Sequence, residues 1–509
     1  MRCALLLFSL AFGATALNCP VGHPRVVNIT ITPVVTRDII TGLSGEYILN
    51  YRTQANETLV DIPLTLASRP TAAYDTTTLT AEDGMGTLKL LTSEGTDSDG
   101  QHTRYFRPTR ATHGSVAVRF TAKPSTDFLA HVGPLFDLRQ QAQDNGGGIV
   151  GSSWAFLPGT ASRTLEYEFS LRWDLRNVPC GTTAAWTWGE GAGPFYRTGT
   201  RDDILYTYFA VGRLNRFPSP GAAATIPNKN EFGMYWMDQP SFNTTELGSF
   251  IDEFFNVSST FWQDDTDQPY RVFIRRNGPT EYGSGGTALT RSFSFGWNPA
   301  NDTEQESLRL LISHEMTHNW AIMPGANALI SRWAEGMAEF YSLRLLWRAR
   351  LLSTAQYVQE MNRRLSVYYA NTYINTTDFE AYEHAWDSRD AQTIPYGRGL
   401  IELANLDAAM RNQPDGALSL DDLTHDMRQL CVNSASDCTP ASWVNVTAGY
   451  LGPSAVEEYD RITSGRPLLV PVAGSLGPCF DVVQTGRDLE TWAWEAKEGV
   501  DVSSEACII

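Results

Sequence analysis

Apolar and polar residues alternate along the first part of the chain, between about residues 20 and 215. The clearest stretches, all rich in Val, Ile, Thr and Tyr, are "RVVNITITPVV" (25–35), "EYILNYRT" (46–53), "SVAVRFTA" (115–122) and "LEYEFSLRWDL" (165–175). Alternation places successive side chains on opposite faces of a strand, and the Gly, Pro, Asn and Asp residues between the stretches mark turns. The pattern predicts a β-sandwich-like N-terminal domain.

From about residue 240 the apolar residues take the spacing of helices. Residues 244–262 are amphipathic, and another helix is expected to begin at Asp302 or Thr303 and to end at Pro324-Gly325. The pattern predicts further helices at 329–351, 397–411 and 420–430, and strands at 270–276 and 285–297. About the last 60 residues carry few helical signals, which indicates a small, irregular or β-rich end.

The chain has 509 residues, more than one hydrophobic core usually holds. We therefore expect an α+β multidomain protein. Its predicted parts are a β-rich N-terminal domain at 17–215, a mixed α/β and helical domain at 216–448 and a small C-terminal segment at 449–509.

The first 16 residues have the features of a secretory signal peptide. Arg2 supplies a positive charge, "ALLLFSLAFGA" (4–14) is a short apolar run, and Ala14-Thr15-Ala16 fits the cleavage rule. No later stretch has 18 consecutive apolar residues, so no membrane span is expected. We expect a secreted, extracellular protein whose mature chain begins near Leu17.

Six of the seven cysteines lie beyond the signal peptide, and an even number in an exported chain is typical of disulfides. Proximity in sequence predicts the pairs Cys431–Cys438 and Cys479–Cys507, and elimination then pairs Cys19 with Cys180. Seven N-x-S/T sequons predict a glycoprotein with these asparagines on its surface: Asn28, Asn56, Asn243, Asn256, Asn301, Asn375 and Asn445.

The formal net charge is −18. Nucleic acids and anionic membranes bind basic patches, so the charge argues against both as partners. It indicates neither a substrate nor an oligomeric state.

"LISHEMTHNW" (311–320) carries the spacing H-E-x-x-H on a predicted helix. Residues four apart lie one turn apart on one face, so His314 and His318 can offer two imidazoles to one metal ion. Glu315 directly follows the first histidine, on the open side of such an ion, where a general base must stand. The alternative is a surface helix with solvated His and Glu side chains. The other histidines are scattered and are expected to be ordinary surface or hydrogen-bonding groups: His23, His102, His113, His131, His384 and His425.

Catalytic zinc usually has three protein ligands and one water. Glu335 and Glu339 are four apart in "RWAEGMAEFY" (332–341), so both can face the first helix, and "MPGANAL" (323–329) can turn the chain back. One carboxylate can bind the metal while the other bonds a ligand histidine. Spacing alone leaves their order open and is also compatible with a solvated helix edge.

Three motifs together resemble the gluzincin zinc metallopeptidases, most closely the glycyl aminopeptidase family and more distantly the aminopeptidase N family. They are "HEMTHNW" (314–320), "WAEG" (333–336) and "PYGRG" (395–399). The resemblance covers about residues 165–430 and implies a thermolysin-like catalytic domain at 216–448. It implies one Zn²⁺ per chain bound by His314, His318 and Glu335, with Glu339 supporting a ligand histidine.

The resemblance also implies a reaction, peptide-bond hydrolysis by a zinc-activated water. Glu315 would accept the proton of that water, and the Tyr396 hydroxyl would stabilise the oxyanion. In "PYGRG" Arg398 stands where the family has lysine. A peptide or protein is the expected partner. The first hypothesis is an aminopeptidase for small N-terminal residues such as Gly or Ala.

The edge strand expected before the zinc helix departs from the family pattern. Relatives carry an amine-binding glutamate in a G-G-x-E-type strand, whereas this chain has Gly285, Gly286 and Thr287 followed by Ala288 or Leu289 at the acidic position. Glu281 is nearby but out of register. Residues 285–287 can still pair with a peptide backbone.

A second departure is the short spacer of 16 residues between His318 and Glu335, which requires a tighter loop than in the aminopeptidase N type. Two alternatives therefore stay open. One is a zinc endopeptidase or broad peptidase that lacks the amine anchor. The other is a non-catalytic secreted glycoprotein with a structural zinc site, against which the intact Glu315 and Tyr396 argue, because a structural site needs neither.

Overall fold

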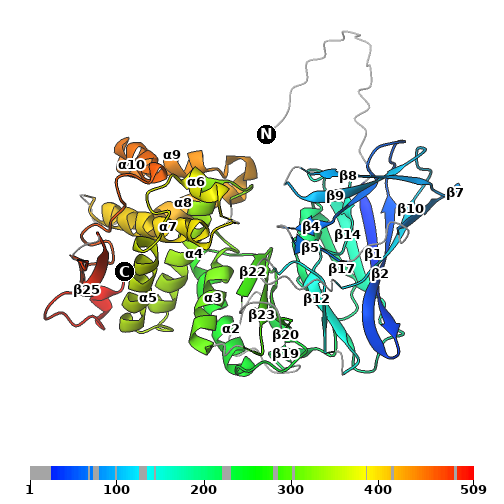
Figure 1. Cartoon of the computed structure of the whole chain (residues 1–509), viewed down its shortest axis with the longest axis horizontal. Helices are drawn as coiled ribbons and strands as arrows, with labels where there is room; N and C mark the ends of the chain where they lie inside the picture. Colours follow the sequence, from blue (N-terminus) through cyan, green and yellow to red (C-terminus); the bar gives the residue numbers. More distant parts are fainter. Residues whose placement is uncertain are drawn as a thin grey trace, which may run out of the picture.

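The computed structural model is shown in Figure 1. The structure describes residues 24–66, 69–72, 79–97, 100–124, 135–142, 145–219, 231–278, 285–300, 304–321, 323–385, 387–413, 418–486 and 490–509. The predicted signal peptide and the following positions lie outside the described residues: Cys19, His23, His131, Glu281, Asn301, Asp302 and Thr303. Among the described helices, none has the length and apolar character that a membrane span requires.

Three sheets build the N-terminal part, drawn in blue to cyan-green in Figure 1. The seven-stranded sheet, in the order β17-β14-β1-β2-β10-β6-β7, consists of β1 (Val26–Thr36), β2 (Ile39–Asn50), β6 (Thr80–Asp83), β7 (Gly86–Thr87), β10 (Val116–Ala122), β14 (Tyr167–Trp173) and β17 (Phe195–Gly199). The five-stranded sheet, in the order β11-β12-β18-β15-β16, consists of β11 (Arg139–Gln141), β12 (Gly148–Ser152), β15 (Thr183–Trp186), β16 (Gly189–Glu190) and β18 (Tyr208–Gly212). The four-stranded sheet, in the order β13-β3-β9-β8, consists of β3 (Val60–Pro63), β8 (Leu90–Thr96), β9 (His102–Pro108) and β13 (Gly159–Thr160). The short pair β4 (Thr65–Leu66) and β5 (Arg69–Pro70) and the helix α1 (Asp202–Leu205) complete this part.

The four alternating stretches of the sequence are β1, β2, β10 and β14, which all belong to the seven-stranded sheet. β2 pairs antiparallel with β1 and β10, and β14 runs parallel to β1. Alternate side chains of these strands, such as Val27, Leu49 and Val118, enter one core. The β-rich prediction is confirmed, but the strands form three sheets rather than a two-sheet sandwich, because alternation determines the buried face of a strand and not its partners.

A mixed sheet stands between the N-terminal part and the helices (Figure 1). Its order is β19-β20-β21-β23-β22, with β19 (Asn215–Phe217), β20 (Phe232–Trp236), β21 (Tyr270–Arg276), β22 (Gly285–Leu289) and β23 (Ser292–Trp297). β20, β21 and β23 are parallel, whereas β22 is an antiparallel edge strand. The single strand expected at 285–297 is therefore wrong: the chain reverses at Thr290 and Arg291, and Arg291 has a φ of 52°. Neither residue is usual in a tight hairpin turn, so the reversal has no signal in the sequence.

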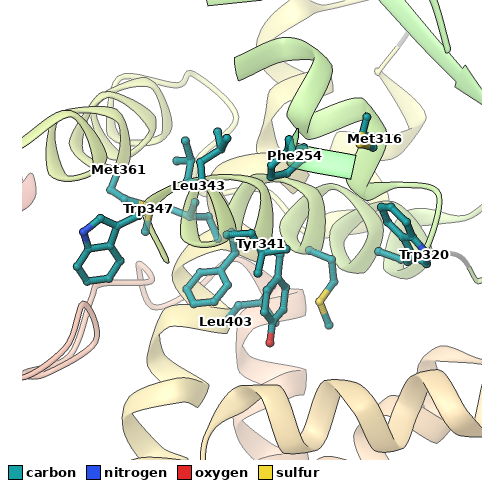
Figure 2. Packing of buried hydrophobic residues seen from close by; sticks show 14 of the residues in the cluster. Phe254, Met316, Trp320, Tyr341, Leu343, Trp347, Met361 and Leu403 are labelled. Carbon is teal, nitrogen blue, oxygen red and sulfur yellow. The ribbon is translucent and has the colours of Figure 1, made fainter. Parts of the chain in front are cut away.

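The helices are α2 (Thr244–Phe261), α3 (Gln305–Thr317), α4 (Ala328–Arg348), α5 (Thr354–Tyr369), α6 (Asp378–Glu383), α7 (Arg389–Arg411), α8 (Leu420–Asn433), α9 (Pro440–Leu451) and α10 (Ser454–Ser464). α4 is at the centre and is buried on most sides. Figure 2 shows Tyr341, Leu343 and Trp347 packed in one cluster with Phe254 of α2, Met316 of α3, Met361 of α5 and Leu403 of α7. The helix that carries Glu335 and Glu339 is thus held from several directions.

Two expected helix boundaries and one expected segment need correction. The helix with the H-E-x-x-H spacing ends at Thr317 rather than at Pro324, and a turn at residues 318–320 follows. α7 begins at Arg389 and contains Pro395, which removes one backbone hydrogen bond near the start of the helix. The C-terminal segment contains α10, an amphipathic helix that Gly465 ends with a φ of 71°.

The end of the chain is a two-stranded sheet of β24 (Phe480–Gln484) and β25 (Trp492–Ala496), followed by a 3₁₀ turn at Glu505–Cys507. Disulfides join Cys431 to Cys438 and Cys479 to Cys507, as predicted. Cys180 is exposed and forms no disulfide with another described cysteine, and its expected partner Cys19 lies outside the described residues.

Candidate metal centre

The two histidines lie at the end of α3. His314 is in its last turn, and His318 is the first residue after it. α4 then begins after Asn327, whose side-chain oxygen accepts hydrogen bonds from the backbone N–H groups of Leu329 and Ile330, both at 3.0 Å. This cap fixes the start of α4 after a short loop, so α4 packs against α3 and presents its carboxylates to the histidines.

Three ligand atoms form a small triangle. His314 Nε2 is 3.2 Å from His318 Nε2 and 3.2 Å from Glu335 Oε2, and His318 Nε2 is 3.4 Å from the same carboxylate oxygen. Four ligands at the usual zinc distances of about 2.0–2.1 Å, placed at the corners of a tetrahedron, lie roughly 3.3–3.4 Å apart. The triangle therefore fits three corners of a tetrahedral zinc site, and its two nitrogen atoms and one oxygen atom are donors that zinc prefers.

Glu339 lies on the other side of the first histidine. Its Oε1 is 3.2 Å from His314 Nδ1, and its Oε2 accepts a hydrogen bond from Arg364 of α5, which also binds Glu360 at 2.6 Å. Burial raises the pKa of Glu339, but Arg364 and His314 together lower it to about 2, so the group is ionised. An ionised acceptor at Nδ1 holds the proton there and leaves Nε2 of His314 as the lone-pair donor.

The negative charges of the neighbouring carboxylates also favour a cation at the triangle. Burial lowers the pKa of His314, but the neighbouring carboxylates of Glu335 and Glu339 raise it to about 10. Burial also acts on Glu335, yet His318 and His314 hold its pKa below the ordinary value. The buried carboxylate of Glu339 and the half-buried carboxylate of Glu335 create a negative environment beside these rings, in which a positive charge is stabilised.

Glu315 lies between the triangle and the edge strand β22. Burial raises its pKa, whereas His318, His314 and a hydrogen bond from the backbone N–H of Ala288 act in the opposite direction. A carboxylate with a raised pKa is a better proton acceptor than a solvated one.

The ring of Tyr396 of α7 stacks on the ring of His314. The two rings are nearly parallel, with centroids 5.6 Å apart and an interplanar angle of 9°. Burial, and then the negative charges of Glu335 and Glu315, raise the pKa of Tyr396 well above its ordinary value. The hydroxyl thus keeps its proton and can act as a hydrogen-bond donor.

The expected substrate-binding residues Gly285, Gly286 and Thr287 are half-buried in β22. Thr287 is in contact with the N-terminal part of the chain: its Oγ1 accepts a hydrogen bond from the N–H of Leu135 at 2.9 Å. A Cβ at Gly286 would meet the ring of Phe293 at 2.0 Å, so this glycine lets the ring pack under the strand. β22 carries no carboxylate.

The structure brings together the six residues that the sequence predicts around the metal: His314, Glu315, His318, Glu335, Glu339 and Tyr396. Arg364 was not among the predicted residues, although its spacing of four from Glu360 on α5 is a pattern that indicates an ion pair. Five sequon asparagines are exposed, namely Asn28, Asn56, Asn243, Asn375 and Asn445. Asn256 is half-buried and donates a hydrogen bond to the backbone oxygen of Asp252 at 2.9 Å.

No protein-family model matches the sequence, and no curated protein matches it. Solved structures, however, share its fold. An aminopeptidase N family protein from Idiomarina loihiensis is 14% identical with a TM-score of 0.61, over 87% of this chain and 77% of that one. A variant of the M1 zinc metallopeptidase from Deinococcus radiodurans, bound to the substrate Tyr-Ser-Ala, is 16% identical with a TM-score of 0.56, over 88% and 96%. Leukotriene A4 hydrolase from Saccharomyces cerevisiae is 11% identical with a TM-score of 0.53, over 88% and 68%. At these identities the similarity concerns the fold, which is that of M1 zinc metallopeptidases.

Proposed function

We propose that the protein is a zinc metallopeptidase of the gluzincin type that hydrolyses peptide bonds. The observation that carries this proposal is the triangle of His314 Nε2, His318 Nε2 and Glu335 Oε2, with edges of 3.2, 3.2 and 3.4 Å. The M1 fold supports it, since several proteins that share the fold are described as zinc metallopeptidases.

Each side chain around the triangle has a role in hydrolysis. A zinc ion bound by His314, His318 and Glu335 supplies Lewis acidity for the scissile carbonyl and for a water. Glu315 accepts a proton from the attacking water and passes it to the leaving amine. The Tyr396 hydroxyl donates a hydrogen bond to the carbonyl oxygen as negative charge develops there. Glu339 holds the His314 ring in its ligating tautomer.

The proposed substrate preference is for small N-terminal residues such as Gly or Ala. It rests on the resemblance of the three motifs to the glycyl aminopeptidase family, which is also the family that we propose for this chain. One observation favours a second candidate, an endopeptidase or broad peptidase: β22 reads GGTAL and offers no carboxylate for a substrate amine. A non-catalytic zinc glycoprotein is the least supported, because a structural site has no use for a half-buried Glu315 beside an edge strand.

A peptide library with matched free and acetylated N-termini tests the proposal. Purified protein is first expected to hold about one zinc per chain, and an absence of bound zinc would contradict every version of the proposal. An aminopeptidase cleaves the free set only, with a preference for Gly and Ala at the first position. Equal cleavage of the acetylated set would instead establish the endopeptidase candidate, and no cleavage of either set would leave a non-catalytic protein.

We also propose that the protein is secreted and glycosylated. The two disulfides and the five exposed sequon asparagines support this proposal. Expression in a eukaryotic secretory host should yield protein in the medium that loses mass on treatment with an N-glycosidase. Retention of an unmodified chain in the cytosol would contradict it.

A further inference from the structure

The helices that carry Glu335 and Tyr396 touch backbone to backbone. A Cβ at Gly399 of α7 would lie 2.5 Å from the carbonyl oxygen of Arg332 and 2.6 Å from Cα of Gly336 on α4. Gly336 is the residue after Glu335, and Gly399 is three residues after Tyr396. The contact therefore lies next to both groups, and any slip of one helix along the other moves Tyr396 relative to Glu335.

A buried cluster of four charges joins the same two helices. We call it the four-charge cluster; it consists of Arg332, Asp378, Arg398 and Glu402. Asp378 bridges the helices, because one oxygen accepts a hydrogen bond from Arg332 of α4 and the other accepts one from Nη1 of Arg398 of α7 at 2.5 Å. Arg332 Nε also lies 2.9 Å from the Glu402 carboxylate of α7.

The four-charge cluster is buried and contains two arginines and two carboxylates. Arg332 and Arg398 are 1% and 0% exposed, and Asp378 is 4% exposed. Arg332 donates a further hydrogen bond to Thr463 at 3.0 Å and stacks over the ring of Tyr459 at 4.3 Å. Arg398 donates to the backbone oxygen of Thr376 at 2.9 Å. Two positive and two negative groups in such a dry environment tolerate little displacement.

The positions of these arginines connect the four-charge cluster to the metal centre. Arg332 is one helical turn before Glu335, and Arg398 is two residues after Tyr396. We propose, on the basis of the proposed function, that Asp378 is a positioning residue that sets Tyr396 and Glu335 in register by binding Arg398 and Arg332. Asp378 acts through the two helices and touches neither the metal ligands nor the substrate.

The test replaces one ion pair of the four-charge cluster without leaving a lone charge. Asp378→Asn alone leaves two buried guanidinium groups beside one carboxylate, which destabilises the fold. The double variant Asp378→Asn with Arg398→Met keeps the Arg332–Glu402 pair and is the variant to measure. Zinc affinity is determined by competition with a chromophoric chelator, and kcat and KM are determined on the best library peptide.

We expect the double variant to bind zinc at least about tenfold more weakly and to lose about tenfold or more in kcat with KM nearly unchanged. In a Tyr396→Phe background, measured at saturating zinc, the loss of kcat is expected to shrink, because one of the two groups being positioned is already absent. An unchanged zinc affinity together with an unchanged kcat, or a full loss of kcat on top of Tyr396→Phe, would overturn the proposal.

A matched control lies on the same helices. Arg344 of α4 binds Asp407 of α7 through Nη1 at 2.9 Å, and this pair is equally buried but lies about two and a half turns from Glu335 along α4. Arg344→Met with Asp407→Asn is expected to lower thermal stability and to leave zinc affinity and kcat within about twofold. Equal losses of zinc affinity and kcat in the control would mean that they follow from lower stability in general, and would contradict a positioning role for Asp378. If the wild type hydrolyses no peptide, the proposed function fails, while zinc affinity still tests Asp378.

Discussion

Glu315 is constrained from two sides. The backbone N–H of Ala288 bonds its carboxylate from β22, and the histidines of α3 lie on the other side. A base held in this way can transfer protons between a water and an amine without a change of rotamer, because the strand and the helix already determine its place.

Replacing Glu315 by Gln should remove hydrolysis and leave the metal in place. The amide keeps the shape and accepts the Ala288 hydrogen bond, but it cannot take a proton, so kcat is expected to fall by at least about a hundredfold. Zinc content by atomic absorption should stay at about one per chain.

The control is Glu306→Gln in the first turn of the same helix, an exposed residue that bonds Gln356. It is expected to hydrolyse peptides at the wild-type rate. Wild-type turnover by Glu315→Gln itself would show that another group is the base.

At the residue scale, the metal centre could be predicted because its residues are close along two helices. H-E-x-x-H needs only helical spacing, and Glu335 and Glu339 need only a loop that folds back. Spacing left their order open, whereas the structure places Glu335 against Nε2 of both histidines and Glu339 against Nδ1 of one. Arg364 and Asp378 could not be found in this way, because their contacts depend on tertiary packing of distant elements.

At the scale of elements, the crossing of α4 and α7 determines how Glu335 and Tyr396 are placed relative to each other. Gly336 and Gly399 permit backbone contact, and no larger residue can take their place without separating the helices. The motif that resembles a peptidase signature thus contains glycines that serve packing as well as residues that serve chemistry.

Gly399→Ala should therefore destabilise the protein. The new methyl group would meet backbone atoms of α4 at 2.5 and 2.6 Å, which cannot move as a flexible side chain does. We expect a loss of about 1–3 kcal/mol or more in the free energy of unfolding, measured by urea denaturation followed by circular dichroism.

Gly449→Ala is the matched control, since a Cβ at this exposed glycine of α9 would meet nothing within 4 Å beyond its own helix. It is expected to gain about 0.5–1 kcal/mol from helix propensity. Equal stability of the two variants would contradict the close contact of α4 and α7.

Some elements were visible in the sequence and others were not. β21 is a short run rich in apolar residues and α8 has the spacing of an amphipathic helix, and the predicted bounds of both agree closely with those of the structure. The hairpin of β22 and β23 was missed because Thr290 and Arg291 are unusual turn residues. α10 was missed because its short amphipathic pattern lies in a region with many turn residues.

At the scale of the whole molecule, the described residues form two large cores. One contains residues from Val27 to Val211, and the other contains residues from Phe232 to Cys507. We propose a domain boundary near residue 215 on this basis. The C-terminal hairpin belongs to the second core, because Trp494 and Phe480 are buried within it.

The two disulfides should contribute unequally to stability. Cys479–Cys507 spans 28 residues and Cys431–Cys438 spans 7. Loop-closure entropy gives about 3–4 kcal/mol for the longer loop and about 2 kcal/mol for the shorter one. Replacing both cysteines of each pair by Ala should lower the thermal midpoint more for Cys479 and Cys507.

Thermal unfolding of the two double variants under identical conditions measures the difference. Equal midpoints, or a larger loss for the short loop, would contradict the dependence of the stabilisation on loop length.

The hydrogen bond from Leu135 to Thr287 has a consequence for any attempt to build a minimal catalytic fragment. The edge strand beside Glu315 has support from both parts of the chain: β23 flanks it on one side, and the N-terminal part bonds its side chain on the other. A fragment that begins at residue 216 would keep every metal-binding group and lose one wall beside that strand. Under the proposed function, such a fragment is expected to bind zinc and to recognise peptides poorly, because the N-terminal sheets support the edge strand beside Glu315.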